Sequence, residues 1–358
     1  MNTEPIERAM DRRSSSPVLG WVTILVIAIG GLALVKWVPY YHKGLYAAAN
    51  HSIGSSILMG NADRPPVPSM RAAIDYAMAY GKAIWKAMVL GLLLGSAVQV
   101  LLPRHWIASS LGGRGMRSVI LGGVLSLPGM MCTCCAAPVV AGLRERRTAP
   151  GSAVAFWLGN TVLNPATLIF TGFVLGWHWS ALRLVLGLIM VFGLGWLVSR
   201  FTGPDEGIRV EQVPVIQGTE KNPERLLVRW LITLGRMSAR LLPEFVVLVL
   251  ALGAARAWLF PHVGHDVDNS LLWIAAFALA GAVFVIPTAG EVPVVQAMLA
   301  LGVGVGPAAA LLMTLPPISI PSVAMLWGSF APRTLRLVSI GVIVLGCAAG
   351  IVATRLFS

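Results

Sequence analysis

The chain has few charged residues, few cysteines and no nucleotide-binding motif. Asp, Glu, Lys and Arg make up only 12% of its 358 residues, whereas 56% are hydrophobic. Soluble domains average about 25% charged residues, so this composition excludes an ordinary soluble fold. Four cysteines are too few for a scaffold held together by disulfides. The absence of a G-x-x-x-x-G-K-[ST] sequence excludes an ATPase of the P-loop type within this chain.

Apolar runs long enough to cross a bilayer recur along the whole chain, and they predict an all-α polytopic membrane protein. The run after the polar residues 1–17 is too long for a signal peptide, so we interpret it as an anchor helix. Most of the Lys and Arg fall in short connectors, where they set topology, so the net charge of +12 does not indicate a nucleic-acid partner. The apolar runs are 18–39, 82–102, 116–143, 150–176, 181–200, 242–260, 271–300, 306–330 and 334–354.

The two halves of the chain repeat each other. "KAMVLGLLLGSAVQVLLP" aligns with "EFVVLVLALGAARAWLFP", which matches Gly95 to Gly253 and Pro103 to Pro261. We therefore expect four parts. These are an anchor helix and outer polar segment (1–81), a first repeat (82–200), a central cytoplasmic loop (201–239) and a second repeat (240–358). A short helix is expected from Ser69 to Tyr80.

Two of the apolar runs predict re-entrant hairpins. Arginines flank both ends of 116–143, which has a Pro-Gly break at its middle, so both ends are expected in the cytoplasm. No Lys or Arg directly flanks 271–300, so this hairpin is expected to enter from outside. The sequence thus predicts about seven full spans plus two hairpins, with inverted repeats and a substrate site between them, as in secondary transporters. We expect a bacterial-type inner membrane, with the N-terminus in the cytoplasm.

The stretch "SLPGMMCTCCAAPVV" brings soft sulfur to the expected tip of the first hairpin. In a helical turn Cys132 and Cys135 share a face, whereas in an extended tip Cys132 and Cys134 do. Converging thiolates bind thiophilic ions and metalloids, and Met130 and Met131 add thioether sulfur. The alternative is that the cysteines are small residues that let helices pack closely. Cys347 is expected to be only a small buried residue.

Other polar residues within apolar runs are also candidates. Asn160 and the Asn164-Pro165 pair follow the cysteine hairpin, where proline frees backbone carbonyls for a ligand, or where local hydrogen bonds simply accommodate a kink. Glu291, at the expected tip of the second hairpin, and Glu244 are candidates for proton coupling. A carboxyl held at that tip in low dielectric favours its neutral form, which suits a proton carrier. Either glutamate could instead pair near an interface.

The residues from "LPGMMCTCCAAPVVAGLRERRTAPGSAVAFWLGNTVLNPATL" to "IPTAGEVPVVQAMLALGVGVGPAAALLMTLPPISIPS" resemble the ArsP-type predicted permeases. The resemblance covers about residues 82–356. It implies a permease that exports trivalent organoarsenicals, with Cys132 and Cys134 as the family's Cys-x-Cys. This sequence departs from that pattern by adding Cys135, and a soft metal such as Cu(I) would suit the site equally well.

The candidate site follows from these observations. Its substrate-binding residues are Cys132, Cys134, Cys135, Met131, Thr133, Asn160, Asn164, Thr288 and Glu291, and the three cysteines are the ligands if the cargo is a metal ion. The expected function is export of a small thiophilic substrate across the lipid bilayer, without a cofactor and without enzymatic activity. The main rival is a transmembrane thiol-disulfide oxidoreductase relay. An accessory subunit with a structural metal is a third possibility. The oligomeric state is left open.

Overall fold

The computed structural model describes residues 17–58, 66–102, 104–203, 223–260 and 264–357, and every regular element within them is helical. The anchor and first half contain α2 Pro17–Leu32, η2 Ala33–Trp37, α3 Val38–Asn50, α4 Met70–Leu101, α5 Arg104–Leu111, α6 Met116–Ser126, η3 Leu127–Gly129, α7 Thr133–Glu145, α8 Pro150–Val162, α9 Pro165–Val174, α10 Trp177–Leu188, η4 Ile189–Gly193 and α11 Leu194–Phe201. The second half contains α12 Pro223–Leu259, α13 Leu271–Val283, α14 Glu291–Ala300, α15 Val305–Thr314, α16 Ile320–Leu326 and α17 Pro332–Phe357.

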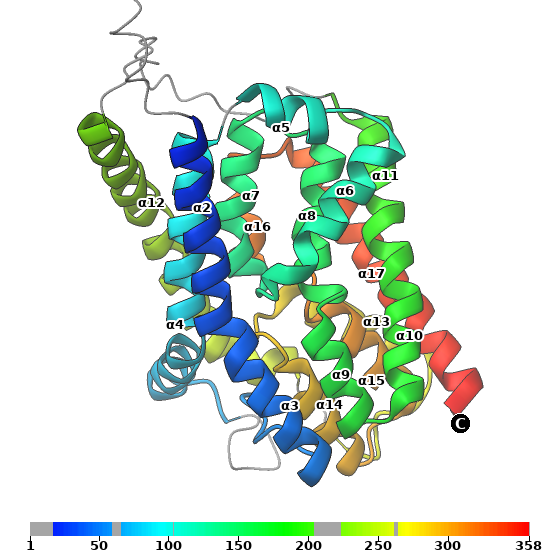
Figure 1. Cartoon of the computed structure of the whole chain (residues 1–358). Coiled ribbons are helices and arrows are strands. Elements are labelled where there is room, and N and C mark those ends of the chain that lie inside the picture. Colours follow the sequence, from blue (N-terminus) through cyan, green and yellow to red (C-terminus); the bar gives the residue numbers. More distant parts are fainter. Residues whose placement is uncertain (1–16, 59–65, 103, 204–222, 261–263, 358) are drawn as a thin grey trace, which may run out of the picture.

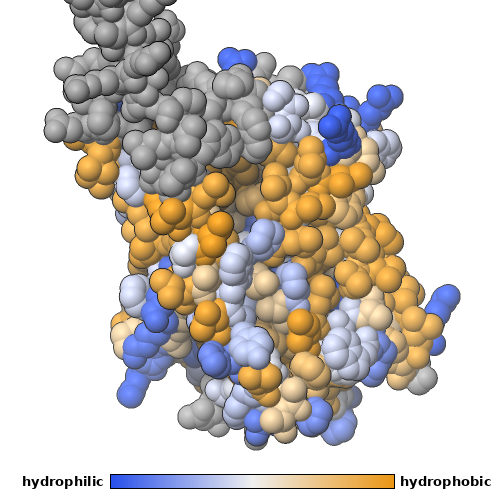
Figure 2. All heavy atoms as spheres, in the orientation of Figure 1, coloured by the Kyte–Doolittle hydropathy of each residue, from blue (hydrophilic) through white to orange (hydrophobic). Residues whose placement is uncertain are grey.

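The predicted all-α polytopic membrane fold is confirmed. Among the described residues, six helical segments are long and apolar enough to cross a membrane. The seventh expected span, 306–330, is divided into α15 and α16. Figure 2 shows a broad hydrophobic surface around the middle of the molecule, with hydrophilic residues gathered mainly towards its two ends. Large apolar side chains such as Leu34 and Leu272 are exposed, which suits a protein surrounded by lipid and not by water.

Two helical hairpins enter the bundle from opposite ends. The first consists of α6 and α7, which lie in the upper half of Figure 1, and the second consists of α13 and α14, which lie in the lower half. Residues 127–132 break the first hairpin at the Pro-Gly pair, and residues 284–290 break the second. Each hairpin packs on a broken helix, because α6 contacts α8 and α13 contacts α15. The two halves thus present the same element order in opposite directions.

Both broken helices are interrupted where the sequence places proline. Between α8 and α9, the Asn164 side chain caps the new helix by accepting hydrogen bonds from the backbone amides of Ala166 (3.0 Å) and Thr167 (3.3 Å). Between α15 and α16, Ser319 and Ser322 form a reciprocal capping box. Proline cannot donate to the helical ladder, so each interruption needs such a cap. The breaks place helix ends in the interior of the bundle.

Three expected boundaries are wrong. The helix expected from Ser69 to Tyr80 continues to Leu101 as part of α4. The first helix extends through α3 to Asn50, so residues 40–50 do not belong to a polar loop. Residues 223–239, expected in the central loop, form the first turns of α12, whereas 204–222 lie outside the described residues. In each case a polar stretch continues a neighbouring helix, because helix propensity does not require an apolar sequence.

The matched glycines have different neighbours. A Cβ atom on Gly95 of α4 would lie 2.4 Å from the backbone oxygen of Pro138 in α7, so these two helices approach backbone to backbone. A Cβ atom on Gly253 of α12 would instead lie 2.9 Å from Cβ of Tyr76 in α4. The two matched glycines therefore do not make matching helix contacts, although the contacts of α6 with α8 and of α13 with α15 correspond. The close approach of α4 fixes the position of α7, which begins at the cysteines.

Candidate functional site

The thiols of Cys132 and Cys135 meet at the N-terminal end of α7. Cys132 is the N-cap residue, and its Sγ atom lies 2.8 Å from Sγ of Cys135 one turn later. Both thiols are free, and the two residues are 4% and 0% exposed. Of the two arrangements predicted for the tip, the structure has the helical one. Residues three apart share a helix face, so Cys132 and Cys135 are the pair that meets. Two soft ligands therefore converge inside the bundle.

Cys134 lies on the other side of the same turn. Its Sγ atom lies 3.9 Å from Oγ1 of Thr133 and 3.8 Å from Oγ of Ser319, the N-cap residue of α16. Within the described part of the chain, no three His, Cys, Asp or Glu residues form a group that could hold a metal ion. The expectation of a three-cysteine metal site needs correction to two, because a two-residue step rotates a side chain by about 200° around a helix.

A small cavity lies between the cysteine tip and the second hairpin. Its volume is about 10 Å³, which is room for about one water molecule. Residues of both halves line it: Cys132, Thr161, Ile286, Pro287, Thr288, Ala289, Glu291 and Pro316. Thr288 also accepts a hydrogen bond from Nζ of Lys36 (3.2 Å). The structure thus brings together the predicted residues Cys132, Thr288 and Glu291 around one small cavity.

Glu291 has a buried basic partner that sequence reasoning missed. Nη1 of Arg183, on α10, lies 2.7 Å from Oε1 of Glu291, and the two side chains are 1% and 3% exposed. Arg183 also donates hydrogen bonds to the carbonyl oxygens of Thr161 (2.9 Å) and Val162 (3.3 Å), where α8 ends. Glu291 is therefore paired with a buried cation at this tip, which is one of the alternatives that the sequence left open. A basic residue inside the run 181–200 was the available signal.

Lys36 is a second buried cation that sequence reasoning missed. It lies in the π-helical segment η2 of the anchor helix and is 5% exposed. Its Nζ atom donates to the hydroxyl of Tyr40 (3.1 Å) and to Oγ1 of Thr288 (3.2 Å). The ammonium also interacts electrostatically with Cys132 and Cys135. Single π-helical turns often mark functional sites, and here the turn brings a lysine from the anchor helix to the cavity residues.

The remaining predicted residues are buried, but they differ in which of their polar atoms have hydrogen-bond partners. Met131 is 3% exposed, and Nδ2 of Asn160 donates to the carbonyl oxygen of Phe156 (3.0 Å). Oδ1 of Asn160 and Nδ2 of Asn164 are buried without a hydrogen-bond partner among the described residues. Asn164 therefore caps a helix, which fits the alternative that local hydrogen bonds accommodate the break. Each asparagine still has one polar atom that a ligand could bind.

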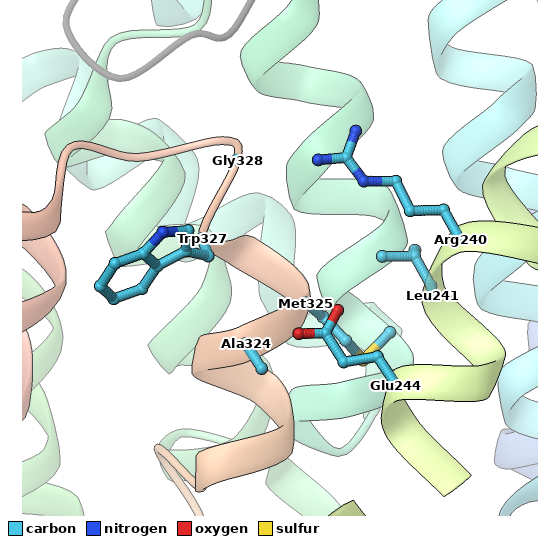
Figure 3. Close-up of a pocket in the computed structure, with 7 residues that line it drawn as sticks. All are labelled: Arg240, Leu241, Glu244, Ala324, Met325, Trp327 and Gly328. Carbon is cyan, nitrogen blue, oxygen red and sulfur yellow. The ribbon is translucent and has the colours of Figure 1, made fainter. Parts of the chain in front are cut away.

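Glu244 lies away from the cysteine cavity, in a separate pocket between α12 and α16 (Figure 3). This pocket has a volume of about 410 Å³, and Arg240, Glu244, Met325 and Trp327 are among the residues that line it. Figure 3 shows the Glu244 carboxylate pointing from α12 towards α16, with the Arg240 guanidinium at the upper end of the pocket. The coupling candidates Glu244 and Glu291 therefore occupy different sites.

Comparison with known proteins places the chain among predicted permeases. The family model described as ArsP_1, predicted permease, matches residues 18–158 and 82–355. The chain is 49% identical to UPF0718 protein YraQ of Escherichia coli (strain K12) over 343 residues, which cover 94% of this chain and 96% of the relative. It is 23% identical to UPF0718 protein MJ0584 of Methanocaldococcus jannaschii over 331 residues, which cover 72% of this chain and 88% of that relative. No solved structure matches.

The helices of a multi-pass membrane protein, the opposed hairpins and the family match agree with one another. The match to the family model spans the anchor helix and both halves of the bundle. The chain belongs to the ArsP_1 family of predicted permeases.

Proposed function

We propose that this permease exports a thiophilic substrate, such as a trivalent (organo)arsenical or a soft metal ion, through the Cys132–Cys135 dithiol. The observation that carries the proposal is the contact between two free buried thiols at the tip of one hairpin, beside a cavity that the other hairpin also lines. Thiol pairs bind soft ions and metalloids, and transporters built from inverted repeats bind their cargo between the repeats.

The chemistry of binding needs only the two thiols. A monosubstituted arsenical R–As(OH)₂ exchanges both As–O bonds for As–S bonds, and the two thiol protons leave with the hydroxides as two water molecules. Because the cavity has room for about one water molecule, cargo enters only after the hairpin tips separate. Hairpins that enter from opposite ends allow the site to open to one side at a time.

Glu291 and Glu244 are the proposed coupling residues. Protonation of Glu291 would remove the charge that pairs with Arg183 and so weaken the link between α14 and α10. Glu291→Gln is then expected to abolish the pH dependence of transport in vesicles, whereas Glu244→Gln tests a separate step at the α12–α16 pocket. An unchanged pH dependence in both variants would exclude these two residues from coupling.

The proposal is tested in a sensitive host challenged with trivalent arsenicals, antimonite, Cu(I), Ag(I) and Hg(II). Cys132→Ser and Cys135→Ser keep the side-chain size nearly constant and remove one soft ligand each, so we expect normal protein abundance and lost resistance. Cys347→Ser is the matched control, because this cysteine lies in α17, away from the tip. If the wild-type protein relieves none of these sensitivities, the proposed function is refuted.

A thiol-disulfide relay is the second candidate. A Cys-x-x-Cys spacing at a helix N-terminus, with the sulfurs in contact, also suits a dithiol that cycles to a disulfide. Against it, the described residues of the second hairpin contribute no cysteine. Alkylation with a mass-tagged maleimide, before and after reduction, separates the two. Protection by cargo without any oxidised form favours the permease, and a reducible intramolecular disulfide formed during turnover favours the relay.

A further inference from the structure

Lys36 is a buried cation whose hydrogen-bond partners among the described residues are neutral. Its hydrogen-bond acceptors are the neutral hydroxyls of Tyr40 and Thr288, and no carboxylate of the described residues pairs with it. The nearby carboxylate of Glu291 already pairs with Arg183. A buried charge is expensive unless it is compensated, and an ionisable residue inside a membrane helix indicates function. A negative charge supplied by a ligand would compensate it.

The anchor helix holds this cation against both hairpin tips. Lys36 donates to Thr288 at the tip of the second hairpin. The next residue, Trp37, donates from Nε1 to the carbonyl oxygen of Pro128 (2.9 Å) at the tip of the first hairpin. The anchor is therefore part of the site, although its sequence predicted only a membrane anchor. Thr288, which accepts the hydrogen bond from the ammonium, lines the same cavity as Cys132.

The charged side chains around the site leave an excess of positive charge when the thiols are neutral. Arg183 and Glu291 cancel, Lys36 remains, and the partly exposed Lys43 of the same anchor helix adds a further positive charge that interacts with Glu291 and Lys36. We propose that Lys36, the buried member of this excess, is the counter-charge of the bound cargo, and that the site selects anionic complexes over neutral ones. The inference rests on the proposed function, because it concerns the cargo carried by the Cys132–Cys135 dithiol.

The two proposed cargo classes differ in the charge of their complexes. A monovalent soft cation forms a linear complex with two thiolates, Cu⁺ + 2 R–SH → [Cu(S–R)₂]⁻ + 2 H⁺, and the protons leave to solvent. A monosubstituted trivalent arsenical forms a neutral R–As(S–R)₂ complex and releases water. Lys36 stabilises the first complex by charge pairing and has no net charge to pair with in the second. Cu(I) or Ag(I) is therefore the favoured cargo class.

The test uses the purified full-length protein. Cu(I) affinity is measured by competition with a chromophoric Cu(I) chelator, and arsenical affinity is measured with phenylarsine oxide as the probe. Lys36→Gln keeps a donor for Thr288 but removes the charge, and Lys36→Arg keeps the charge. Lys86→Gln, at an exposed position of α4, is the matched control.

Lys36→Gln is expected to weaken Cu(I) binding at least about tenfold relative to phenylarsine oxide, because an uncompensated buried charge is costly. Lys36→Arg is expected to restore most of that ratio, and Lys86→Gln to leave it unchanged. If Lys36→Gln weakens the binding of both probes equally, Lys36 only supports Thr288 and the inference is overturned. If the substitution weakens the binding of neither probe, the inference is overturned as well. If neither probe binds the wild-type dithiol, the proposed function fails first, and the inference fails with it.

Discussion

Replacing Glu291 with Gln leaves Arg183 as a buried and unpaired cation. The two side chains are 1% and 3% exposed, so solvent does not screen the loss. Removing one partner of a buried ion pair costs about 3 to 5 kcal/mol. We expect the variant to be less stable than the wild type by that amount, even though Gln has almost the same shape as Glu.

The size of the thermal shift follows from the chain length. Unfolding entropies of about 2.1 cal/mol/K per residue give about 0.75 kcal/mol/K for 358 residues. A loss of 3 to 5 kcal/mol then lowers the melting temperature by about 4 to 7 °C. The 12 tryptophans make intrinsic fluorescence in detergent a suitable assay.

A double-mutant cycle isolates the pair. Arg183→Gln also removes hydrogen bonds to the carbonyl oxygens of Thr161 and Val162, so this single variant is expected to be destabilised as well. The double variant Arg183→Gln/Glu291→Gln leaves no unpaired charge and is expected to be less destabilised than the sum of the two, by about 0.5 to 3 kcal/mol. If the destabilisation of the double variant equals the sum of the two single variants, or if Glu291→Gln melts at the same temperature as the wild type, the buried ion pair is refuted.

Three further predictions concern the thiols, the topology and the helix packing. Cys134→Ser is expected to retain more cargo binding than Cys135→Ser, because only the latter removes a member of the converging pair; equal losses in a binding titration would contradict this. Cysteine tags introduced at Arg146 and at His265 are expected to react from the inside and the outside respectively, and labelling of both from one side would disprove the inverted arrangement. Gly95→Leu is expected to lower the amount of folded protein, measured by fluorescence size-exclusion chromatography, because overpacking against the Pro138 backbone costs at least about 1 to 3 kcal/mol; unchanged abundance would show that α4 can move away from α7.

The hydrophobic runs and their breakers determine the helices of this protein. A bilayer-length apolar run has to satisfy its backbone internally, and a Pro-Gly pair interrupts it, so the break of the first hairpin follows from local sequence. The runs 150–176 and 306–330 were expected as full spans, and their division into α8 and α9 and into α15 and α16 was not predicted. The sulfur cluster, and its place at a hairpin tip, follow in the same way. The N-terminal ends of α4 and α12 could not be predicted from hydropathy, because polar residues extend both helices beyond their apolar runs.

Tertiary structure decided which side chains meet. The three cysteines are equivalent in the sequence, and the N-cap position of Cys132 is what sets the helical phase that brings Cys135 to it and turns Cys134 away. Lys36 and Arg183 lie in apolar runs far along the chain from the hairpin tips, and only long-range packing brings one to Thr288 and the other to Glu291. Local sequence sets where a helix begins and which face a residue occupies, but the partner across an interface depends on the packing of the whole bundle.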